Sequence, residues 1–248
     1  MLGLKYLSDI GSLIEDFASR EGEALTRAAT IAADCVAEKG AMHHFDTGHM
    51  KEEPIRRAGG FLGLHHLELR VEAEHRLPPG REASLDLIRQ KYFYDREDLA
   101  ALLLDKSHVR RGDVLIQVSN SGKEPFTVGV GLEAKKRGLK LIVLTSVAFS
   151  KTLEPRHSSG KRLFEVADAV VDMGSPFGDA LIEINGLDAK VGASSGVLTA
   201  VALWSLMVEI AEALVARGLK PAIYKSVNLP EGFQFNAEQE RLYHERGI

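Results

Sequence analysis

Cysteine is almost absent from this chain of 248 residues, which contains Cys35 alone. A single cysteine excludes an intrachain disulfide and leaves no cysteine spacing of the kind that binds structural zinc. A chain without disulfides suits a reducing compartment. We therefore expect a cytoplasmic protein whose fold rests on its apolar core.

An excess of basic charge is also missing. The chain has 31 lysine and arginine residues against 35 aspartate and glutamate residues, and its formal net charge is -4. Nonspecific binding to nucleic acid or to an anionic membrane surface needs a basic face. We expect neither partner, and an anionic ligand must be held by local groups.

Long apolar runs are lacking as well. The longest run, residues 197–208, is too short to span a bilayer and continues into Glu209 and Glu212, so we interpret it as a core helix. The first residues contain Lys5 and Asp9 and show no cleavage pattern of a signal peptide. With 45% hydrophobic and 27% charged residues, the composition is that of a globular protein.

Helical periodicity dominates the first part of the chain. Apolar residues recur at helical spacing over residues 6–39, with a break at residues 20–22. This pattern predicts an N-terminal helical arm over residues 1–39. We expect the α/β core and a C-terminal tail to occupy residues 40–248, and the whole chain, 1–248, to form one domain.

Short apolar runs alternate with helical stretches after the arm, which predicts a parallel sheet of about five strands. The expected strands are residues 41–45, 61–69, 113–118, 139–145 and 169–173. The order 2-1-3-4-5 would give a three-layer, flavodoxin-like α/β fold. Between strands two and three we expect a polar excursion over residues 71–84 and a helix over residues 85–104.

The loop Ser119-Asn120-Ser121-Gly122 follows the third strand and precedes a helix that we expect to end at Arg137, capped by Gly138. Two hydroxyls and several backbone N–H groups at a helix N-terminus can hold an anion. Capping of the helix by serine and asparagine explains the same residues equally well. We expect Lys123 in the first helical turn, where its positive charge is unfavourable beside the positive end of the helix dipole. A bound phosphate would balance that charge. Alternatively, Lys123 is a solvated surface residue next to Glu124.

A second strand-to-helix turn follows the first strand and contains Thr47, Gly48 and His49. It matches no Walker or dinucleotide fingerprint. In the order 2-1-3-4-5, strands one and three are neighbours, and the connections after them diverge. The turn at Thr47 and the loop at Ser119 would then be two walls of one crevice.

The segment 118–123 resembles the sugar isomerase (SIS) domain family, in particular its uncharacterised single-domain branch near the phosphoheptose isomerases. The resemblance continues through residues 157–163, 178–180, 190–192 and 226–228. It implies that Ser119, Asn120 and Ser121 hold the phosphate of a phosphosugar. It also implies that Thr47 and Gly48 line the sugar side, and that the protein is a homodimer or a larger oligomer with sites near subunit interfaces.

Two positions depart from the family pattern. His49 and Met50 follow Gly48 where the family often has a serine, and Glu124 and Pro125 occupy the stretch, a few residues after the serine pair, where a serine or threonine is usual. Aldose–ketose isomerisation needs a base and an acid but no cofactor. Our candidates are His49 and Glu53, with His157 in reserve. Alternatively, His49 is a structural donor at a helix start, and Glu52 and Glu53 are surface carboxylates that complement the helix dipole.

Further polar residues have a functional and a structural interpretation. The pairs His43-His44 and His65-His66 suggest a metal site, but neighbours on a strand point to opposite faces, so we expect no metal. Ser194 and Ser195 begin the apolar helix, where one caps the helix and the other is free to face a ligand or a partner subunit. The apolar circumference of that helix requires burial on more than one side, which dimer packing would supply.

The function that the sequence favours is binding of a phosphorylated sugar and its isomerisation between aldose and ketose, without a cofactor. Two alternatives stay open. One is a phosphosugar sensor that does no chemistry. The other is an enzyme that deaminates an amino-sugar phosphate or cleaves its ether.

Overall fold

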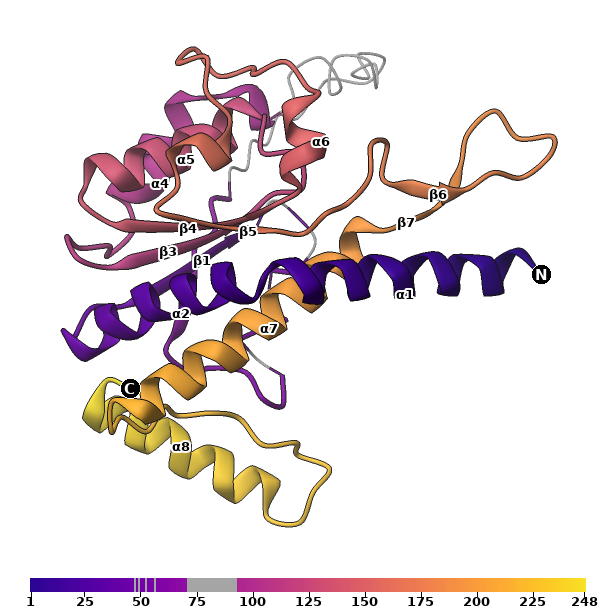
Figure 1. Ribbon diagram of the computed structural model, residues 1–248. Coiled ribbons are helices and arrows are strands. Elements are labelled where there is room, and N and C mark those ends of the chain that lie inside the picture. Colours follow the sequence, from indigo (N-terminus) through magenta and orange to yellow (C-terminus); the bar gives the residue numbers. More distant parts are fainter. Residues whose placement is uncertain (47, 49, 52, 56, 71–92) are drawn as a thin grey trace, which may run out of the picture.

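The computed structural model describes residues 1–46, 48, 50–51, 53–55, 57–70 and 93–248. Its centre is a parallel sheet of five strands in the order β2-β1-β3-β4-β5 (Figure 1). The predicted strand order and flavodoxin-like α/β class are thus confirmed. The strands are β1 Met42–Asp46, β2 Leu64–His66, β3 Val114–Val118, β4 Lys140–Thr145 and β5 Ala169–Asp172.

The middle strands are apolar because helices cover both faces of the sheet. Every residue of β3 is buried, and so is all of β4 after Lys140. The parallel register sets Asp46 beside Val118, so the chain leaves β1 and β3 at adjacent points of the carboxyl edge. The second strand is shorter than the expected run of residues 61–69, since Phe61 instead forms an isolated bridge with Ile223.

One face of the sheet carries the helices α1 Leu2–Arg20, α2 Gly22–Ala37 and α7 Ser195–Ala216. The predicted break between the first two helices at residues 20–22 is confirmed. Four alanines of α2 are almost fully buried against the sheet and α7, and their small size permits close packing. They are Ala28, Ala29, Ala32 and Ala33.

The other face carries α4 Asp98–Asp105, α5 Pro125–Lys136 and α6 Val147–Lys151, with two short 3-10 helices, Phe93–Asp95 and Leu163–Val166. Of the expected helix over residues 85–104, the structure shows α4 at its end, while residues 85–92 and the expected polar excursion over residues 71–84 lie outside the described residues. Gly138 ends the α5 connection with φ +83°, as its predicted capping role requires.

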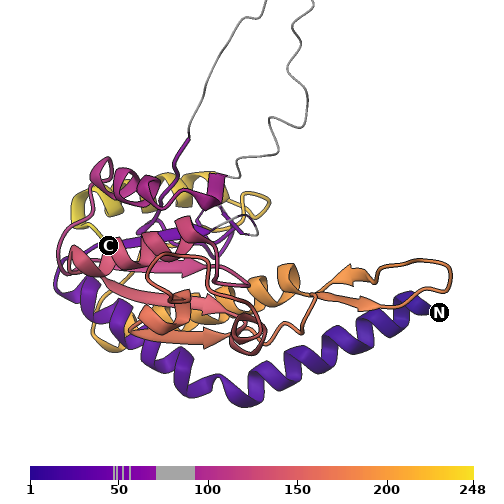
Figure 2. The ribbon, with the colours of Figure 1, turned by 90° about the horizontal axis from the view of Figure 1, so that it is seen from above.

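An antiparallel hairpin that the sequence analysis did not predict projects from the body beside the first half of α1 (Figures 1 and 2). Its strands are β6 Ala180–Ile182 and β7 Val191–Ala193. The Tyr6 hydroxyl donates a 2.8 Å hydrogen bond to the carbonyl of Ala193. The Tyr6 ring also lies over Gly192, where a Cβ atom would come within 2.8 Å of it. Helix and hairpin therefore form one projecting unit, which we call the arm.

The C-terminal lobe consists of the loop that follows α7 and the helix α8 Gly232–Arg246. Tyr243 joins the lobe to the sheet edge through a 2.7 Å contact between its hydroxyl and Nε2 of His65. The lobe lies on the side of α7 that faces away from the sheet (Figure 1).

The helix α7 is long and apolar enough to cross a membrane by length and composition, with 44% of its most apolar window buried. In this structure one face of α7 packs in the core instead. Leu203, Leu206 and Met207 are no more than 1% exposed in the core cluster that also contains the α2 alanines. The packing agrees with the prediction of a core helix.

Candidate functional site

The serine loop, residues 119–122, lies at the carboxyl edge between β3 and α5. Gly122 has φ +56°, and its N–H donates to Oγ of Ser119 over 3.2 Å. Asn120 fixes the loop to the end of β4. Its carbonyl accepts the N–H of Ser146 at 3.0 Å, and its Oδ1 accepts the Ser146 hydroxyl at 2.6 Å. The backbone of the loop is therefore held before any ligand arrives.

Ser121 differs from its neighbours because its side chain is partly exposed. Within the described part of the chain, its hydroxyl and its N–H donate to no other group, and neither does the N–H of Lys123. These groups are donors at the mouth of a preorganised loop. Such donors favour an anion.

Lys123 and Glu124 lie outside the helix, which corrects the placement of Lys123 in the first helical turn. Glu124 is extended and α5 begins at Pro125, a residue whose missing N–H suits the first helical position. Oε2 of Glu124 accepts a 2.6 Å bond from Arg156, which also binds Asp95 at 2.7 Å. Lys123 lies 3.9 Å from the same glutamate. Cations thus offset the carboxylate at the helix N-terminus.

More hydroxyls surround the serine loop than the sequence analysis identified. Ser146 follows β4, and its Oγ accepts the N–H of Ser175, which follows β5, at 3.0 Å. The hydroxyls of Ser150 and Ser175 are buried and, among the described residues, have no hydrogen-bond partner. A Cβ atom on Gly122 would lie 3.6 Å from the Ser150 hydroxyl. The positions of Ser146 and Ser175 just after apolar strands were the signal that could have revealed them.

The turn after β1 is organised by Asp46, which the sequence analysis did not single out. Its carboxylate accepts the N–H of Gly48 at 2.7 Å and also the N–H of Met50. Gly48 itself has φ +152°. The geometry brings this turn next to the serine loop at the carboxyl edge, as predicted, because β1 and β3 are paired. Thr47, His49 and Glu52 lie outside the described residues.

Glu53 lies in the same turn, and its side chain is 30% exposed. Its Oε2 accepts a 3.2 Å bond from Nη1 of Arg57. Glu53 makes no hydrogen bond or ion pair with the serine loop in the part of the chain that the structure describes. A role for Glu53 in acid–base chemistry stays a prediction.

His157 lies in the loop that follows α6. Its Nδ1 is 2.9 Å from the Ser159 hydroxyl, and its Nε2 is 3.7 Å from Oε2 of Glu97. The imidazole is 10% exposed and faces Gly129 on α5. These contacts fasten the loop to the helical layer, and the role of His157 as a reserve base stays a prediction.

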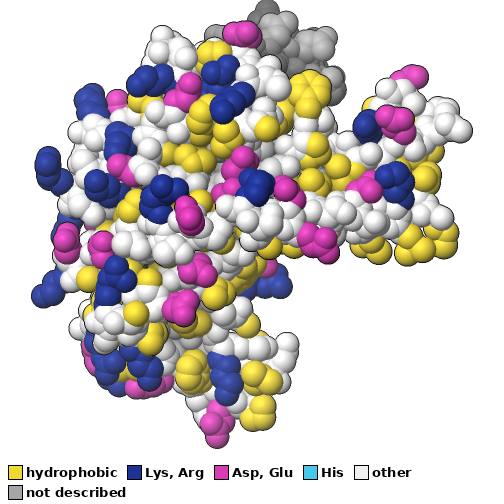
Figure 3. Space-filling view, viewed as in Figure 1, with side chains coloured by type: hydrophobic (Ala, Val, Ile, Leu, Met, Phe, Trp, Pro, Cys, Tyr) yellow, Lys and Arg dark blue, Asp and Glu magenta, His cyan; other side chains and the backbone are white. Residues whose placement is uncertain are grey.

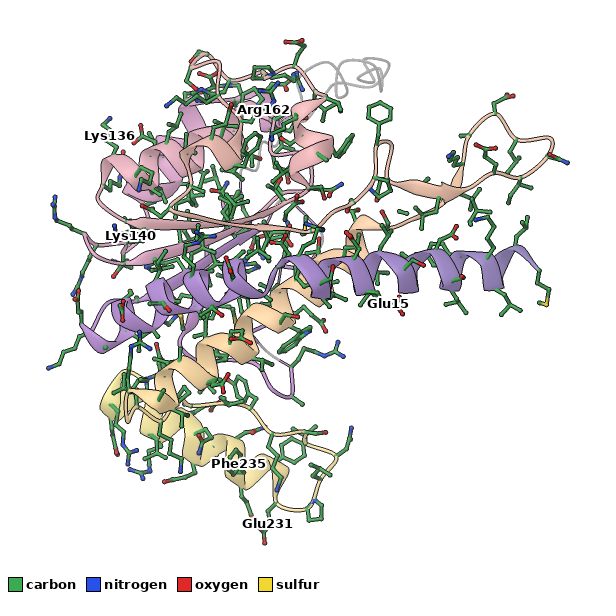
Figure 4. The ribbon with its side chains drawn as sticks, viewed as in Figure 1. Glu15, Lys136, Lys140, Arg162, Glu231 and Phe235 are labelled. Carbon is green, nitrogen blue, oxygen red and sulfur yellow. The ribbon has the colours of Figure 1, made fainter. Side chains whose placement is uncertain are left out.

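The loop after α6 is hydrogen-bonded both to the serine loop and to α6 and the residues that follow it. The N–H of Leu163 donates to the carbonyl of Gly122 at 2.8 Å. The Arg162 guanidinium lies beside α6 (Figure 4) and donates to the carbonyls of Ser150 and Leu153 at 3.0 Å and 2.8 Å. The loop after α6 therefore forms a fixed border of the serine loop.

Ser194 and Ser195 both bind Asp179. The Ser195 hydroxyl donates to Oδ2 at 2.7 Å and the Ser194 hydroxyl donates to Oδ1 at 2.9 Å. Burial raises the pKa of Asp179, but the hydrogen bonds from Ser195 and Ser194 outweigh that effect and lower it overall. The two serines thus hold the first turn of α7 to β6, and their contact with a substrate stays a prediction.

The two histidine pairs lie across β1 and β2. His43 and His65 share one face with ring centroids 6.1 Å apart, and His44 and His66 share the other with centroids 6.0 Å apart. Each ring thus faces its counterpart, as the strand geometry required. Nε2 of His43 is 3.0 Å from Asp113, a carboxylate that sequence analysis missed. No group of three or more histidine, cysteine or acidic side chains suited to a metal occurs among the described residues.

Comparisons with known proteins agree with the fold. The family model of the SIS domain matches residues 5–146. The chain belongs to the SIS domain family. The match starts within α1 and ends after β4.

Two relatives of this protein match nearly the whole length of the chain. A UPF0309 protein of Listeria monocytogenes serovar 1/2a is 29% identical over 245 residues, which are 99% of this chain and 98% of the relative. A UPF0309 protein of Caldanaerobacter subterraneus is 31% identical and covers 97% of each chain. The fold is similar to the phosphoheptose isomerase of Neisseria gonorrhoeae, with TM-score 0.53, 13% identity, and coverage of 86% of this chain and 96% of that one.

Proposed function

We propose that this SIS domain protein binds a phosphorylated sugar at the serine loop and converts it between aldose and ketose without a cofactor. The observation that carries the proposal is the set of donors in the loop. The backbone N–H groups of Ser121 and Lys123 donate to no acceptor among the described residues. Donors at a helix N-terminus suit a phosphate dianion.

Each residue of the loop has a separate part in this proposal. Ser119, Asn120 and Ser121 hold the phosphate, and Gly122 supplies the left-handed turn that directs the N–H groups toward it. Lys123 adds a positive charge. Arg156, bound to Glu124 at 2.6 Å, offsets part of the repulsion that this carboxylate would exert on the ligand.

The sugar lies, in this proposal, against the turn after β1, where Thr47 and Gly48 contact it. A base must move a proton between two adjacent carbons while an acid or donor handles ring opening and the developing enediolate. We assign this work to His49 and Glu53, with His157 in reserve. The gonococcal structure of similar fold is a phosphoheptose isomerase, which is consistent with this chemistry.

The proposed setting is a cytoplasmic homodimer or larger homo-oligomer. Neither nucleic acid nor a membrane is a proposed partner, since the net charge of -4 supplies no excess of basic groups for nonspecific binding.

Proton transfer through an enediolate leaves a trace that tests the activity directly. We would incubate the protein with a panel of aldose and ketose phosphates in D2O and follow the protons on C1 and C2 by NMR. An isomerase produces the other isomer and, where its base exchanges with solvent, incorporates deuterium at C1 of the ketose and at C2 of the aldose. His49→Ala and Glu53→Gln should each slow product formation by roughly a hundredfold or more.

The same samples separate the alternatives. If a phosphosugar binds but neither the other isomer nor deuterium incorporation appears, the protein is a phosphosugar sensor and not an isomerase. Release of ammonia or lactate from an amino-sugar phosphate would replace it with a deaminase or an etherase. Ser12→Ala, on the exposed part of α1, is the matched control and should behave as the unmodified protein.

A further inference from the structure

A cleft of about 580 Å³ lies between the helix α8 and two loops, one at residues 57–58 and the other at residues 224–228. We call it the lobe cleft. No residue of the serine loop lines it, so it is a separate space from the proposed phosphate site. Its volume lies within the range of about 300–1,000 Å³ that small-molecule sites occupy.

The walls of the lobe cleft are held together by hydrogen bonds to the backbone. The N–H of Gly59 donates to the carbonyl of Tyr224 at 2.8 Å, and the N–H of Tyr224 donates to the carbonyl of Gly60 at 3.0 Å. Asn236 on α8 accepts the N–H of Lys225 at 2.8 Å and donates to its carbonyl at 2.9 Å. Both loops and the helix therefore keep their places before a ligand arrives, which lowers the entropy cost of binding.

Two cations line the lobe cleft. Nζ of Lys225 lies 3.4 Å from the carbonyl of Pro230 and 5.7 Å from the ring centroid of Phe235, and it forms no ion pair with a described carboxylate. Arg57 has a side chain that is 65% exposed, and its Nη1 donates to Glu53 at 3.2 Å. An ammonium without a carboxylate partner, together with a guanidinium in the same cleft, favours an anionic ligand.

An exposed aromatic ring forms part of the same cleft. Phe233 lies in the first turn of α8, lines the cleft and is 74% exposed. Phe235 and Glu231 mark this end of the helix (Figure 4), and on the lobe a basic side chain lies between hydrophobic ones (Figure 3). A phenylalanine buries about 150–250 Å² when it is covered, and its face stacks well on another flat ring. A ligand with a planar ring would cover Phe233.

Two further polar groups of the cleft have free hydrogen-bonding capacity. Oε1 of Glu240 accepts the hydroxyl of Tyr224 at 3.1 Å, while its Oε2 accepts no donor among the described residues. The backbone N–H of Asn228 donates to Oγ of Ser226 at 3.3 Å, and its side-chain amide has no hydrogen bond in the described part of the chain. A carboxylate is the group that binds the ribose hydroxyls in dinucleotide-binding folds.

The combination of these groups decides the class of ligand. Inorganic phosphate would use the two cations and leave the aromatic ring uncovered, and a sugar phosphate likewise has no planar ring. A nucleoside would cover the ring and leave the cations without an anion. A nucleoside monophosphate supplies a planar base, ribose hydroxyls and a phosphate in one molecule, and bases commonly stack on aromatic side chains beside a cationic groove.

We propose that the lobe cleft binds a nucleoside monophosphate, with the base on Phe233 and the ribose hydroxyls at Glu240. The phosphate lies between Arg57 and Lys225. Because Arg57 also binds Glu53 in the turn after β1, the phosphate competes with that carboxylate for the guanidinium. The inference goes beyond the proposed function and does not depend on it, since the serine loop contributes nothing to this cleft.

The test is calorimetric titration of the full-length protein with AMP and with UMP, which carry a purine and a pyrimidine base. At least one of them should bind with one-to-one stoichiometry. Phe233→Ala and Lys225→Gln should each weaken this binding by roughly tenfold or more, because one removes the stacking surface and the other a charged donor. If Lys225→Gln does not fold, as judged by circular dichroism, Arg57→Gln takes its place at an exposed side chain.

Each variant has a matched control that should bind the nucleotide like the unmodified protein. Phe177→Ala removes a ring that is 73% exposed just before β6. Lys151→Gln removes an ammonium that lies 5.9 Å from the ring centroid of Phe164, an arrangement similar to that of Lys225. Ser121→Ala should also leave nucleotide binding unchanged, because Ser121 belongs to the serine loop and not to the lobe cleft.

Four results would overturn the proposal. The first is that neither nucleotide binds. The second is an affinity that neither Phe233→Ala nor Lys225→Gln changes. The third is binding that Ser121→Ala abolishes, which would place the nucleotide at the serine loop. The fourth is an equal affinity of the cleft for ribose 5-phosphate or for adenosine, because the cleft would then recognise only the phosphate or only the base.

Discussion

Asp179 and Ser195 form a two-point contact that holds the start of α7 in place. Oδ1 of Asp179 accepts the N–H of Ser195 and Oδ2 accepts its hydroxyl, each at 2.7 Å. Asp179 has φ +64°, a conformation that aspartate adopts more readily than most residues. The carboxylate therefore performs the N-terminal capping that the serines themselves do not supply to the helix.

Removal of this cap should destabilise the fold. Asp179→Ala leaves the N–H of Ser195 without an acceptor, removes one of the two acceptors of the Ser194 N–H and puts an alanine at a left-handed position, so the free energy of unfolding should fall by about 1–3 kcal/mol. Urea unfolding measures the change. Asp188→Ala, at an exposed aspartate of the same hairpin connection, should change it little, and equal midpoints for the two variants would contradict the capping role.

Acidification below neutral pH should destabilise the protein through His65. Burial lowers the pKa of His65 below its ordinary value of 6.5, and repulsion from His43 lowers it further, while Asp113 acts in the opposite direction. The unfolded chain consequently takes up the proton first. The contribution of neutral His65 to the free energy of unfolding is complete above pH 6.5, and it falls as the pH drops toward the lower pKa of the folded state.

Melting curves across this range check the histidine prediction. The melting temperature should fall between pH 7.5 and 5.5, roughly the range over which histidines titrate, and the fall should be smaller in His65→Gln. His108→Gln, at an exposed position, is the control. An equal fall in all three proteins would assign the pH dependence to other groups, such as His44, whose pKa burial also lowers.

Gly122 should not tolerate a side chain. A Cβ atom there would lie 3.2 Å from both Leu163 Cβ and Thr145 Oγ1, and φ is +56°. Gly122→Ala should therefore cost about 1–3 kcal/mol of stability and abolish sugar-phosphate binding by displacing the N–H groups of the loop. Gly196→Ala, in the first turn of α7 with open space around it, is the matched control. Unchanged ligand affinity in Gly122→Ala would contradict the importance of the loop conformation.

The sheet could be predicted from sequence because its signals are local. Residues 113–118 and 139–145 are apolar runs bounded by turn residues, and the helix between them ends at Gly138. The alternation of strands and helices predicts a parallel sheet but not its strand order, which follows only from the analogy to flavodoxin-like sheets. The adjacency of the turn after Asp46 and the loop at Ser119 follows from that order alone.

The hairpin of β6 and β7 and the caps could not be predicted in the same way. The strands of the hairpin are three residues each, too short for a period-two pattern, and Tyr6 reaches Ala193 across 187 positions of sequence. Asp179 was visible only as part of a motif, and its partnership with Ser195 depends on where the hairpin returns. The contacts of His157 with Glu97 likewise depend on a fold that brings a loop and a distant helix start together.

Calorimetric titration of the protein with sugar phosphates and with the same unphosphorylated sugars tests the central claim most directly. The account predicts that at least one phosphorylated sugar binds while its unphosphorylated counterpart does not, and that Ser121→Ala weakens this binding by about tenfold or more, as the loss of a hydrogen bond to a charged group implies. No binding by any phosphosugar in a broad panel, or an affinity that Ser121→Ala leaves unchanged, would contradict the assignment of the serine loop as the phosphate site.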